Sequence, residues 1–315
     1  MRKGLPENFL ERCESIFGRA NFDKIKTTFR ERPTTFRVNT IKAKKEEILE
    51  KLQQTGLKVR RVPWYADAFI LEKGSQRELL KLEMYEKGQI YLQSLASMVP
   101  VLILDPRPGE RVLDLTAAPG SKTGQMAAIM KLEGELVANE VNPIRFEKLV
   151  HNMQLLGVED KNFLRLLNED GVGLYEKYSE YFDKVLLDAP CGAEARFNEK
   201  EIRSFAFWNE RKIKEHAHLQ RKLLFSAWSA LRSGGTLVYS TCTFAPEENE
   251  AQVNWLLEKF PNEAVVEKIN VANLETVPVA TQWKGEKYRQ QIKNCLRIMP
   301  TGFVEGFFVA KIKKI

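Results

Sequence analysis

Two cysteines follow neighbouring predicted strands and are the residues best suited to covalent chemistry. Cys191 lies in Asp188-Ala-Pro-Cys-Gly192, and Cys242 lies in Ser240-Thr-Cys-Thr243. A lone cysteine is usually a small buried hydrophobic residue, but parallel strands present their carboxyl ends at one crevice. Because the whole chain has only four cysteines, two thiols at one crevice indicate nucleophilic catalysis.

A zinc site is the alternative use of these thiols. The sequence has three histidines, His151, His216 and His218, and none stands at ligand spacing from either cysteine. His216 and His218 are two residues apart on a predicted helix, so they point to different faces. No CxxC pair is present either, and the sequence therefore predicts neither a metal site nor a disulfide framework.

Carboxylates stand near the ends of the first four predicted strands of the sheet, counted from residue 111. Asp114 lies in the first, Glu140 ends the second, Asp170 follows the third and Asp188 ends the fourth. An acidic residue at the end of the second strand can accept hydrogen bonds from both ribose hydroxyls of an adenosine. Each alone is more often a helix cap or a solvated loop residue, but four at one sheet edge indicate a binding site.

The segment 113–123 reads as a strand, a tight turn and the start of a helix. Gly120 allows a ligand to approach the backbone closely, and the following helix offers free N–H groups. The phosphate loop of a nucleotide hydrolase is a rival interpretation, because Lys122 and Thr123 and a later strand ending in an aspartate resemble its motifs. In this chain Thr116 and Ser121 occupy the two glycine positions that such a loop needs.

The elements that position these residues alternate from residue 91 onward. A helix is expected over 91–102, and a C-terminal hairpin about Gly302 and Gly306. The repeated units predict a doubly wound, mostly parallel sheet. Its expected strands are 111–115, 134–140, 162–167, 182–188 and 234–240, and its helices are 123–130, 143–156 and 212–231.

The N-terminal part predicts a smaller α+β unit. Residues 5–30 are expected to be helical, followed by a strand at 35–39, a helix at 42–54 and strands at 57–62 and 68–71. Its candidate contacts to phosphates and a stacked base are Arg37, Lys58, Arg60, Arg61 and Trp64.

The excess of positive over negative charge is confined to this N-terminal part. Residues 1–90 carry 20 Lys and Arg against 13 Asp and Glu, whereas residues 91–315 carry 29 of each kind. A basic domain at 1–90 next to a neutral one at 91–315 suits a polyanion-docking surface that feeds a catalytic domain. The alternative is that these basic residues only solvate their helices.

Length and composition favour a globular protein of the cytoplasm. The 315 residues are 43% hydrophobic and 29% charged, and no apolar run is long enough to span a bilayer. No apolar signal region follows Met1-Arg-Lys-Gly4. We expect a cytoplasmic monomer with reduced thiols and no membrane partner.

Taken together, the motifs resemble the Sun (Nol/Nop) family of RNA cytosine-5 methyltransferases. The resemblance runs from Phe36-Arg-Val-Asn-Thr-Ile41 to Glu305-Gly-Phe-Phe-Val-Ala-Lys-Ile312, nearly the whole chain. Its specific segments come in the family's order at 89–93, 113–123, 188–191, 240–243 and 246–250. The resemblance implies a Rossmann-like class I methyltransferase with a mostly parallel α/β sheet, a terminal antiparallel hairpin and a small N-terminal RRM-like α+β domain.

The resemblance also implies roles for individual residues. Cys242 is the nucleophile that adds to carbon 6 of a cytidine in tRNA or rRNA, Cys191 assists release, and Asp188 and Lys122 border the base. Lys122 is also expected to favour the thiolate of Cys242. The residues implied to bind S-adenosylmethionine are Thr116, Ala117, Ala118, Pro119, Gly120, Ser121, Lys122, Glu140, Arg145, Asp170 and Asp188.

The chain departs from the family pattern in three places. Thr116 stands where the family usually has cysteine, Ser121 where it usually has glycine, and the loop after Cys191 reads Gly-Ala-Glu-Ala-Arg196 instead of the common Ser-Gly-x-Gly form. Two rivals remain within this fold: an RNA-binding module without activity, and a DNA cytosine methyltransferase, in which the Pro-Cys cysteine is the nucleophile.

Overall fold

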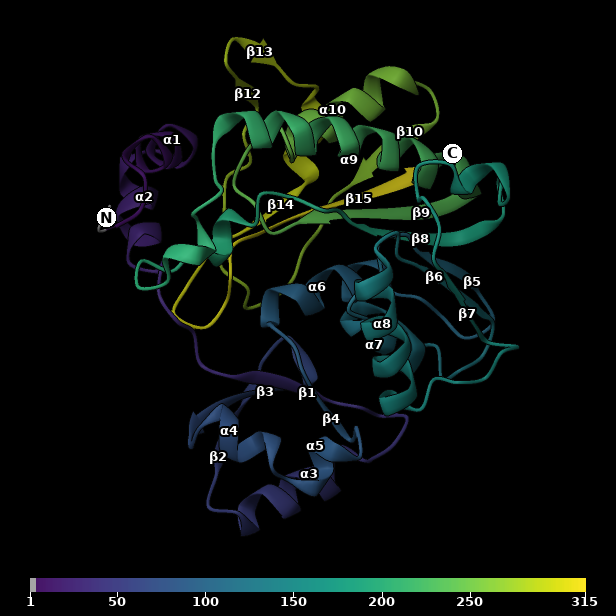
Figure 1. Ribbon diagram of the computed structural model, residues 1–315. Coiled ribbons are helices and arrows are strands. Elements are labelled where there is room, and N and C mark those ends of the chain that lie inside the picture. Colours follow the sequence, from purple (N-terminus) through teal and green to yellow (C-terminus); the bar gives the residue numbers. More distant parts are fainter. Residues whose placement is uncertain (1–3) are drawn as a thin grey trace.

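The chain forms a small antiparallel sheet near its N-terminus and a large mixed sheet in the remainder (Figure 1). The computed structural model describes residues 4–315, so Met1, Arg2 and Lys3 of the basic segment 1–90 lie outside the described residues. No helix within residues 4–315 is both long enough and apolar enough to cross a membrane.

The small sheet has four strands in the order β2-β3-β1-β4, all antiparallel. Its apolar face is covered by short helices, and Phe36 stacks on Phe69 in that core with 5.6 Å between ring centroids. The strands are β1 (Thr35–Val38), β2 (Lys58–Val62), β3 (Tyr65–Lys73) and β4 (Ile90–Leu92), and the helices are α3 (Lys45–Gln54), α4 (Gln76–Leu80) and α5 (Glu83–Glu86). The predicted β-α-β-β succession is present.

The helix expected over 91–102 begins later than predicted. Residues Ile90–Leu92 are extended because they pair with β1 and complete the small sheet. The helix itself is α6, Leu95–Leu104, and it is buried along nearly its whole length. The apolar run of this segment therefore serves two elements, which its hydrophobic pattern alone does not separate.

The first helical segment divides into α1 (Glu7–Phe17) and α2 (Arg19–Lys26). Gly18, with φ of 73°, breaks it in a backbone conformation that suits glycine. Both helices pack on aromatic residues of the larger part of the molecule rather than on the small sheet, as Figure 1 shows at the left. Ring centroids of Phe9 and Phe197 lie 4.9 Å apart, and those of Phe17 and Phe244 lie 5.2 Å apart.

The large sheet contains nine strands, and five of them are parallel. The main path is β11-β14-β15-β9-β8-β5-β6-β7, and β10 pairs with β15. The parallel strands are β5 (Arg111–Asp114), β6 (Glu135–Asn139), β7 (Leu164–Leu167), β8 (Phe182–Asp188) and β9 (Leu231–Thr241), and the antiparallel ones are β10 (Ala264–Glu267), β11 (Thr276–Val277), β14 (Leu296–Ile298) and β15 (Phe307–Lys314). The mostly parallel sheet with an antiparallel C-terminal hairpin is as predicted.

Helices cover both faces of this sheet because its strands alternate between two apolar cores. Leu113 and Val137 face the core under α9 (Glu210–Ala230) and α10 (Glu250–Lys259). Val112 and Leu136 face the core under α6, α7 (Ser121–Ile129) and α8 (Pro143–Leu156). The sequence analysis did not predict α10, β10, β11 or the small hairpin of β12 (Gln282–Trp283) and β13 (Glu286–Lys287).

Candidate active site

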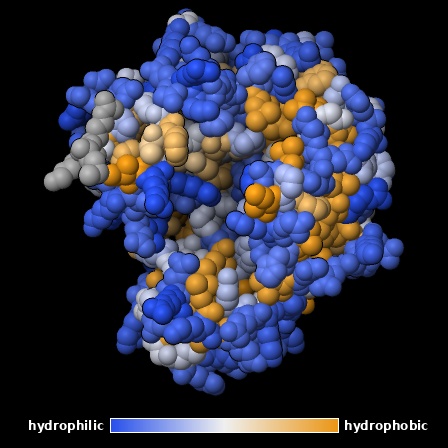
Figure 2. All heavy atoms as spheres, viewed as in Figure 1, coloured by the Kyte–Doolittle hydropathy of each residue, from blue (hydrophilic) through white to orange (hydrophobic). Residues whose placement is uncertain are grey.

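A cavity of about 690 Å³ opens at the carboxyl ends of the parallel strands. The surface of the molecule is also hollowed on the face seen in Figure 2, where the small sheet meets the larger part. The cavity wall is formed by the turns after β5, β6, β7, β8 and β9, with β4 and the start of α6 opposite. The candidate catalytic and cofactor-binding residues of the sequence analysis line it with the exception of Gly120, namely Thr116, Ala117, Ala118, Pro119, Ser121, Lys122, Glu140, Arg145, Asp170, Asp188, Cys191 and Cys242.

Gly120 contributes through its backbone instead. Its φ of 101° lies in the left-handed region, and a Cβ there would approach Met153 Cε to 2.8 Å. The residue forms the tight turn from which α7 starts, and the free N–H groups of that helix begin beside the cavity. The strand, turn and helix predicted for 113–123 are therefore present.

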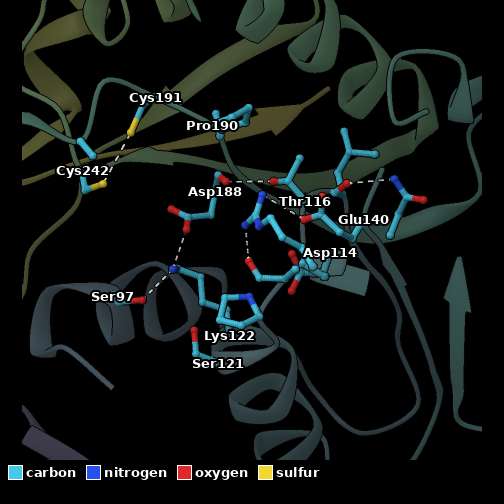
Figure 3. A pocket seen from close by; sticks show the side chains of 18 of the residues that line it. Ser97, Asp114, Thr116, Ser121, Lys122, Glu140, Asp188, Pro190, Cys191 and Cys242 are labelled. Carbon is cyan, nitrogen blue, oxygen red and sulfur yellow. Dashed lines mark hydrogen bonds and ion pairs between the residues drawn. The ribbon is translucent and has the colours of Figure 1, made fainter. Parts of the chain in front are cut away.

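The two thiols face each other at one end of the cavity (Figure 3). The Sγ atoms of Cys191 and Cys242 are 3.5 Å apart, and both cysteines are partly exposed. The hydrogen bond with Cys191 lowers the pKa of Cys242, and nearby Arg196 acts in the same direction against the effect of burial. The same hydrogen bond and burial raise the pKa of Cys191. Either sulfur can be the donor in this contact, and the two pKa directions favour loss of the proton from Cys242 over loss from Cys191.

Asp188 lies between the thiols and the helix that carries Lys122 (Figure 3). Its Oδ2 accepts a hydrogen bond from Lys122 Nζ at 2.6 Å, and its Oδ1 accepts one from Ser240 Oγ at 2.8 Å. Lys122 also donates to Ser97 Oγ at 2.6 Å. Lys122 is thus held by Asp188 and Ser97, and a second cation, Arg196, lowers the pKa of Cys242. Whether Lys122 also favours the thiolate stays a prediction.

The opposite end of the cavity carries the carboxylates. Glu140 is 2% exposed, accepts a hydrogen bond from the Asn142 backbone N–H at 2.9 Å and pairs with Arg145 at 3.2 Å. Arg145 also donates to the carbonyl oxygen of Ala118 at 2.7 Å, which ties the β6 turn to the β5 turn. Asp170 lies on the same wall after β7, where its Oδ1 accepts from the Val172 N–H at 3.0 Å.

Asp114 is buried beneath this end and keeps one oxygen free. Its Oδ2 accepts a hydrogen bond from Thr123 Oγ1 at 2.7 Å, while its Oδ1 has no partner within residues 4–315. Burial raises the pKa of Asp114 to about 7. Asp114 belongs to the cavity wall, and its Oδ1 is a buried acceptor without a partner.

Two buried glutamates form the wall behind the thiols, and sequence reasoning missed both. Glu248 Oε2 accepts from the Gly192 N–H at 3.0 Å and from Gln220 Nε2 at 2.8 Å. Glu194 accepts from Thr243 Oγ1 at 2.8 Å and from Trp208 Nε1 at 2.7 Å. Burial, with the charge of Glu194 nearby, raises the pKa of Glu248 to about 8.

Signals for these residues were present in the sequence. Glu248 lies in the segment 246–250 that the family resemblance includes, and Glu194 and Arg196 lie in the loop that departs from the family pattern. Ser240, which orients Asp188, opens the segment that contains Cys242. Motif position alone did not show which of these side chains turn inward.

Arg37 is not available to RNA, contrary to the expectation that it grips a phosphate. Its side chain is fully buried between the small sheet and α7, where Nε donates to Gln93 Oε1 at 2.9 Å. The guanidinium also lies over the ring of Tyr91, with its Cζ 5.5 Å from the centroid. Arg37 therefore joins the small sheet to the cavity wall.

Within residues 4–315 no group of three or more His, Cys, Asp or Glu side chains could hold a metal ion.

Two family models match this chain. Residues 101–313 match the model described as 16S rRNA methyltransferase RsmB/F, and residues 5–95 match the N-terminal domain of 16S rRNA methyltransferase RsmF. The boundary between the two matches falls near the start of α6.

Curated relatives act on different RNA molecules. A tRNA (cytosine(49)-C(5))-methyltransferase of Pyrococcus abyssi is 36% identical over 89% of this chain and 88% of the relative. A ribosomal RNA small subunit methyltransferase F of Cronobacter sakazakii is 35% identical over 98% of this chain, but the chain spans only 63% of that relative's length.

Solved structures share the fold. A methyltransferase homologue from Pyrococcus horikoshii superimposes with a TM-score of 0.86 at 32% identity and covers 100% of this chain and 97% of its own. NSun6 from the same organism, solved with SFG, gives a TM-score of 0.81 at 24% identity, with 99% of each chain covered, and shows the fold alone. The predicted Rossmann-like methyltransferase fold with a separate N-terminal domain is confirmed.

Proposed function

This chain belongs to the Sun family of RNA cytosine-5 methyltransferases, and on that premise we propose that it methylates carbon 5 of a cytidine in tRNA or rRNA. The observation that carries the proposal is the pair of thiols 3.5 Å apart in the wall that also holds Asp188 and Lys122. A catalytically silent RNA-binding module has no need for this arrangement. We further propose that the enzyme acts as a monomer.

The donor residues of the cavity fit S-adenosylmethionine. Glu140 is oriented by Arg145 to accept hydrogen bonds from the ribose hydroxyls, and Asp170 stands on the same wall for the adenine amine. Thr116 to Lys122 would surround the methionine part, with the free Oδ1 of Asp114 beneath them. When bound, this cofactor supplies an electrophilic methyl group beside the base.

Cys242 performs covalent catalysis in this proposal. Carbon 5 of cytosine is a weak nucleophile until a thiolate adds to carbon 6, which converts the ring into an enamine with a nucleophilic carbon 5. Cys242 forms that sulfur–carbon bond, and the lowered pKa of its thiol increases the fraction of thiolate. The target base must leave its stack to enter the cavity.

Asp188 and Cys191 take part in the two proton transfers that the reaction requires. Addition of the thiolate places electron density on the ring, and a proton shared between Asp188 and Lys122 is available to N3. After methylation the carbon 5 proton must leave so that the Cys242 bond can break. Cys191, whose sulfur touches that of Cys242, is the group placed to assist this step.

The small sheet and its basic residues dock the RNA in this proposal, and 1–90 is then a functional domain beside 91–315. Lys58 and Arg61 are exposed on β2 and at its end. Arg60 is already engaged, because it pairs with Glu72 at 2.8 Å and lies over the ring of Phe303. The docking contact is thus expected at Lys58 and Arg61.

Alanine variants of the two cysteines test the proposal. Cys242→Ala removes the nucleophile and should neither methylate RNA nor form a covalent complex. Cys191→Ala should attack and transfer the methyl group but stall before elimination, which leaves a denaturant-resistant enzyme–RNA band that needs S-adenosylmethionine for full yield. The opposite pattern, with the complex trapped by Cys242→Ala, would assign the attack to Cys191 and the arrangement to that of DNA methyltransferases.

A further inference from the structure

We infer that Arg196 is a positioning residue that sets the charge of the Cys242 thiol. Arg196 lies in the loop where this chain departs from the family pattern, and no role follows for it from the matched motifs. The inference rests on the proposed use of Cys242 as the nucleophile. It concerns how that nucleophile is held ready before RNA arrives.

The turn that carries Arg196 is fastened to the Cys242 segment. The turn is η2, Glu194–Arg196, and its Ala195 N–H donates to the carbonyl oxygen of Cys242 at 3.1 Å. The Glu194 carboxylate accepts from Thr243 Oγ1 at 2.8 Å and from the Phe244 N–H at 2.9 Å. Since three hydrogen bonds join the two segments over consecutive residues, Arg196 is held beside Cys242.

The Arg196 guanidinium faces the cavity and has no carboxylate within hydrogen-bond distance among residues 4–315. Its side chain is 52% exposed and lines the cavity wall together with Cys242. Within residues 4–315 its carboxylate partner is Glu305, with 3.8 Å between Arg196 Nε and Glu305 Oε2, which is beyond hydrogen-bond distance. Glu305 is instead engaged by Ser94 Oγ, which donates to its Oε2 at 2.9 Å.

The remaining charged groups that face Cys242 are carboxylates. Asp188 and Glu305 both disfavour the thiolate, and Glu248 stands behind the pair. The thiol of Cys191 supplies one stabilising hydrogen bond. Arg196 is the cation of this set, and its loss would leave the thiolate among carboxylates. Lys122 does not replace it, because its Nζ is bonded to Asp188 and Ser97.

The pH dependence of alkylation measures this effect in the full-length chain without RNA or cofactor. Iodoacetamide is the probe: the Cys242 thiolate forms a sulfur–carbon bond with its methylene carbon and iodide leaves. Peptide mass spectrometry separates modification of Cys242 from that of Cys191. Arg196→Gln should raise the midpoint of the pH profile by about one unit and lower the rate at pH 7 about tenfold. Arg196→Lys should retain most of the wild-type profile.

Two further variants control the experiment. Arg203→Gln removes an exposed arginine from the neighbouring turn η3, Ile202–Ser204, which lies outside the cavity, and should leave the profile unchanged. Glu305→Gln removes a carboxylate but keeps the acceptor for Ser94, so it should move the midpoint downward. This second direction decides the matter if Arg196→Gln fails to fold.

An unchanged midpoint in a folded Arg196→Gln, or an unchanged midpoint in Glu305→Gln, would overturn the inference. An equal upward shift in Arg196→Lys and Arg196→Gln would also overturn it, because packing rather than charge would then be responsible. Failure of the proposed function is distinguishable. In that case wild-type protein forms no RNA adduct, while the alkylation profile still responds to Arg196.

Discussion

The end of the cavity where we propose that the cofactor binds (the cofactor end) and the end with the two cysteines (the thiol end) are stabilised by different kinds of contact. At the cofactor end, Glu140 is met by Asn142 and Arg145 from the next few residues of the chain. At the thiol end, Glu194 and Glu248 hold together segments far apart in sequence, the loop after β8 and the loop after β9. The first end is a local turn, whereas the second forms only when the tertiary structure is complete.

Because of this difference, we expect substitutions at the cofactor end to change ligand affinity and substitutions at the thiol end to change the stability of the fold. Polar groups at the cofactor end are close to the cavity and few contacts depend on them, so a change there should act on binding. Polar groups at the thiol end are buried and linked to one another, and a change there leaves charges without partners. The following predictions test that separation, from the largest expected effect to the smallest.

Arg297→Met should cause the largest loss of stability. Arg297 is 3% exposed, donates from Nε and Nη2 to the two oxygens of Glu250 at 2.6 Å each, and donates from Nη1 to the Phe244 carbonyl oxygen. Its removal leaves Glu250 buried without its counter-charge, which should cost about 3–5 kcal/mol of unfolding free energy. Urea denaturation measures it.

The exposed pair of Arg211 and Glu215 on α9 provides the matched control. Arg211→Met should change the unfolding free energy by less than about 0.5 kcal/mol, since surface ion pairs contribute little. Losses of similar size in the two variants would mean that the buried pair of Arg297 and Glu250 contributes no more to stability than a surface pair.

Glu140→Ala should weaken S-adenosylmethionine binding by about 1–3 kcal/mol, because the ribose hydroxyls lose a charged acceptor. Isothermal titration calorimetry measures the change. Glu147→Ala is the control, because Glu147 is an exposed carboxylate further along α8, outside the cavity. Unchanged affinity in Glu140→Ala would remove Glu140 from the cofactor site.

Glu248→Gln should reduce the pH dependence of stability. Burial raises the pKa of Glu248 to about 8 in the folded chain, so between roughly pH 4.3, the unfolded value, and pH 8 the folded state retains a proton that the unfolded state loses. Stability therefore falls as pH rises through this window. Glutamine resembles the protonated acid, so from pH 7 to 8 the wild type should lose about 1 kcal/mol more than the variant.

Urea denaturation at the two pH values provides the measurement for Glu248→Gln. The raised pKa of Asp114 also makes stability fall as pH rises, but this effect is present in both the wild type and the variant. The difference between the two proteins therefore isolates Glu248. Equal losses in both proteins would show that Glu248 ionises in the folded chain as it does in the unfolded one.

Reversing Lys58 and Arg61 together to glutamate should have the smallest effect, several-fold in RNA affinity. Each lost phosphate contact should also flatten the slope of log affinity against log salt by about 1. Titration of labelled RNA over a range of salt concentrations measures both. The same reversals at Lys161 and Lys268, exposed residues of the larger part, are the control. A slope that falls equally in the two variants would argue against docking by the small sheet.

Local signals predicted much of the fold and most of the site. The helix expected over 143–156 is α8 with the same bounds, since Asn142 caps it, Pro143 opens it and Gly157 ends it. The parallel strands were readable from their apolar runs, and their carboxyl ends meet at one edge by topology. For that reason nearly all the candidate residues line one cavity.

Long-range contacts explain what the sequence did not predict. Ile90–Leu92 is a strand because β1 lies beside it, and Arg37 is buried because α7 covers it. Phe9 packs against Phe197, which is far from it in the sequence, so no local periodicity predicts this contact. In the sequence Arg196 is only a residue of an unusual loop, because the hydrogen bond from the Ala195 N–H to the Cys242 carbonyl oxygen that places it is a tertiary contact.

The position of β15 has a consequence for synthesis of the protein. Phe307–Lys314 lies between β14 and β9 and also pairs with β10, so three strands depend on it. One of them, β9, leads directly into Cys242. While the ribosome is still translating the codons before Phe307, β9 has an open edge that other nascent chains can pair with. We expect translation that stops there to release an aggregating fragment rather than a partly active enzyme.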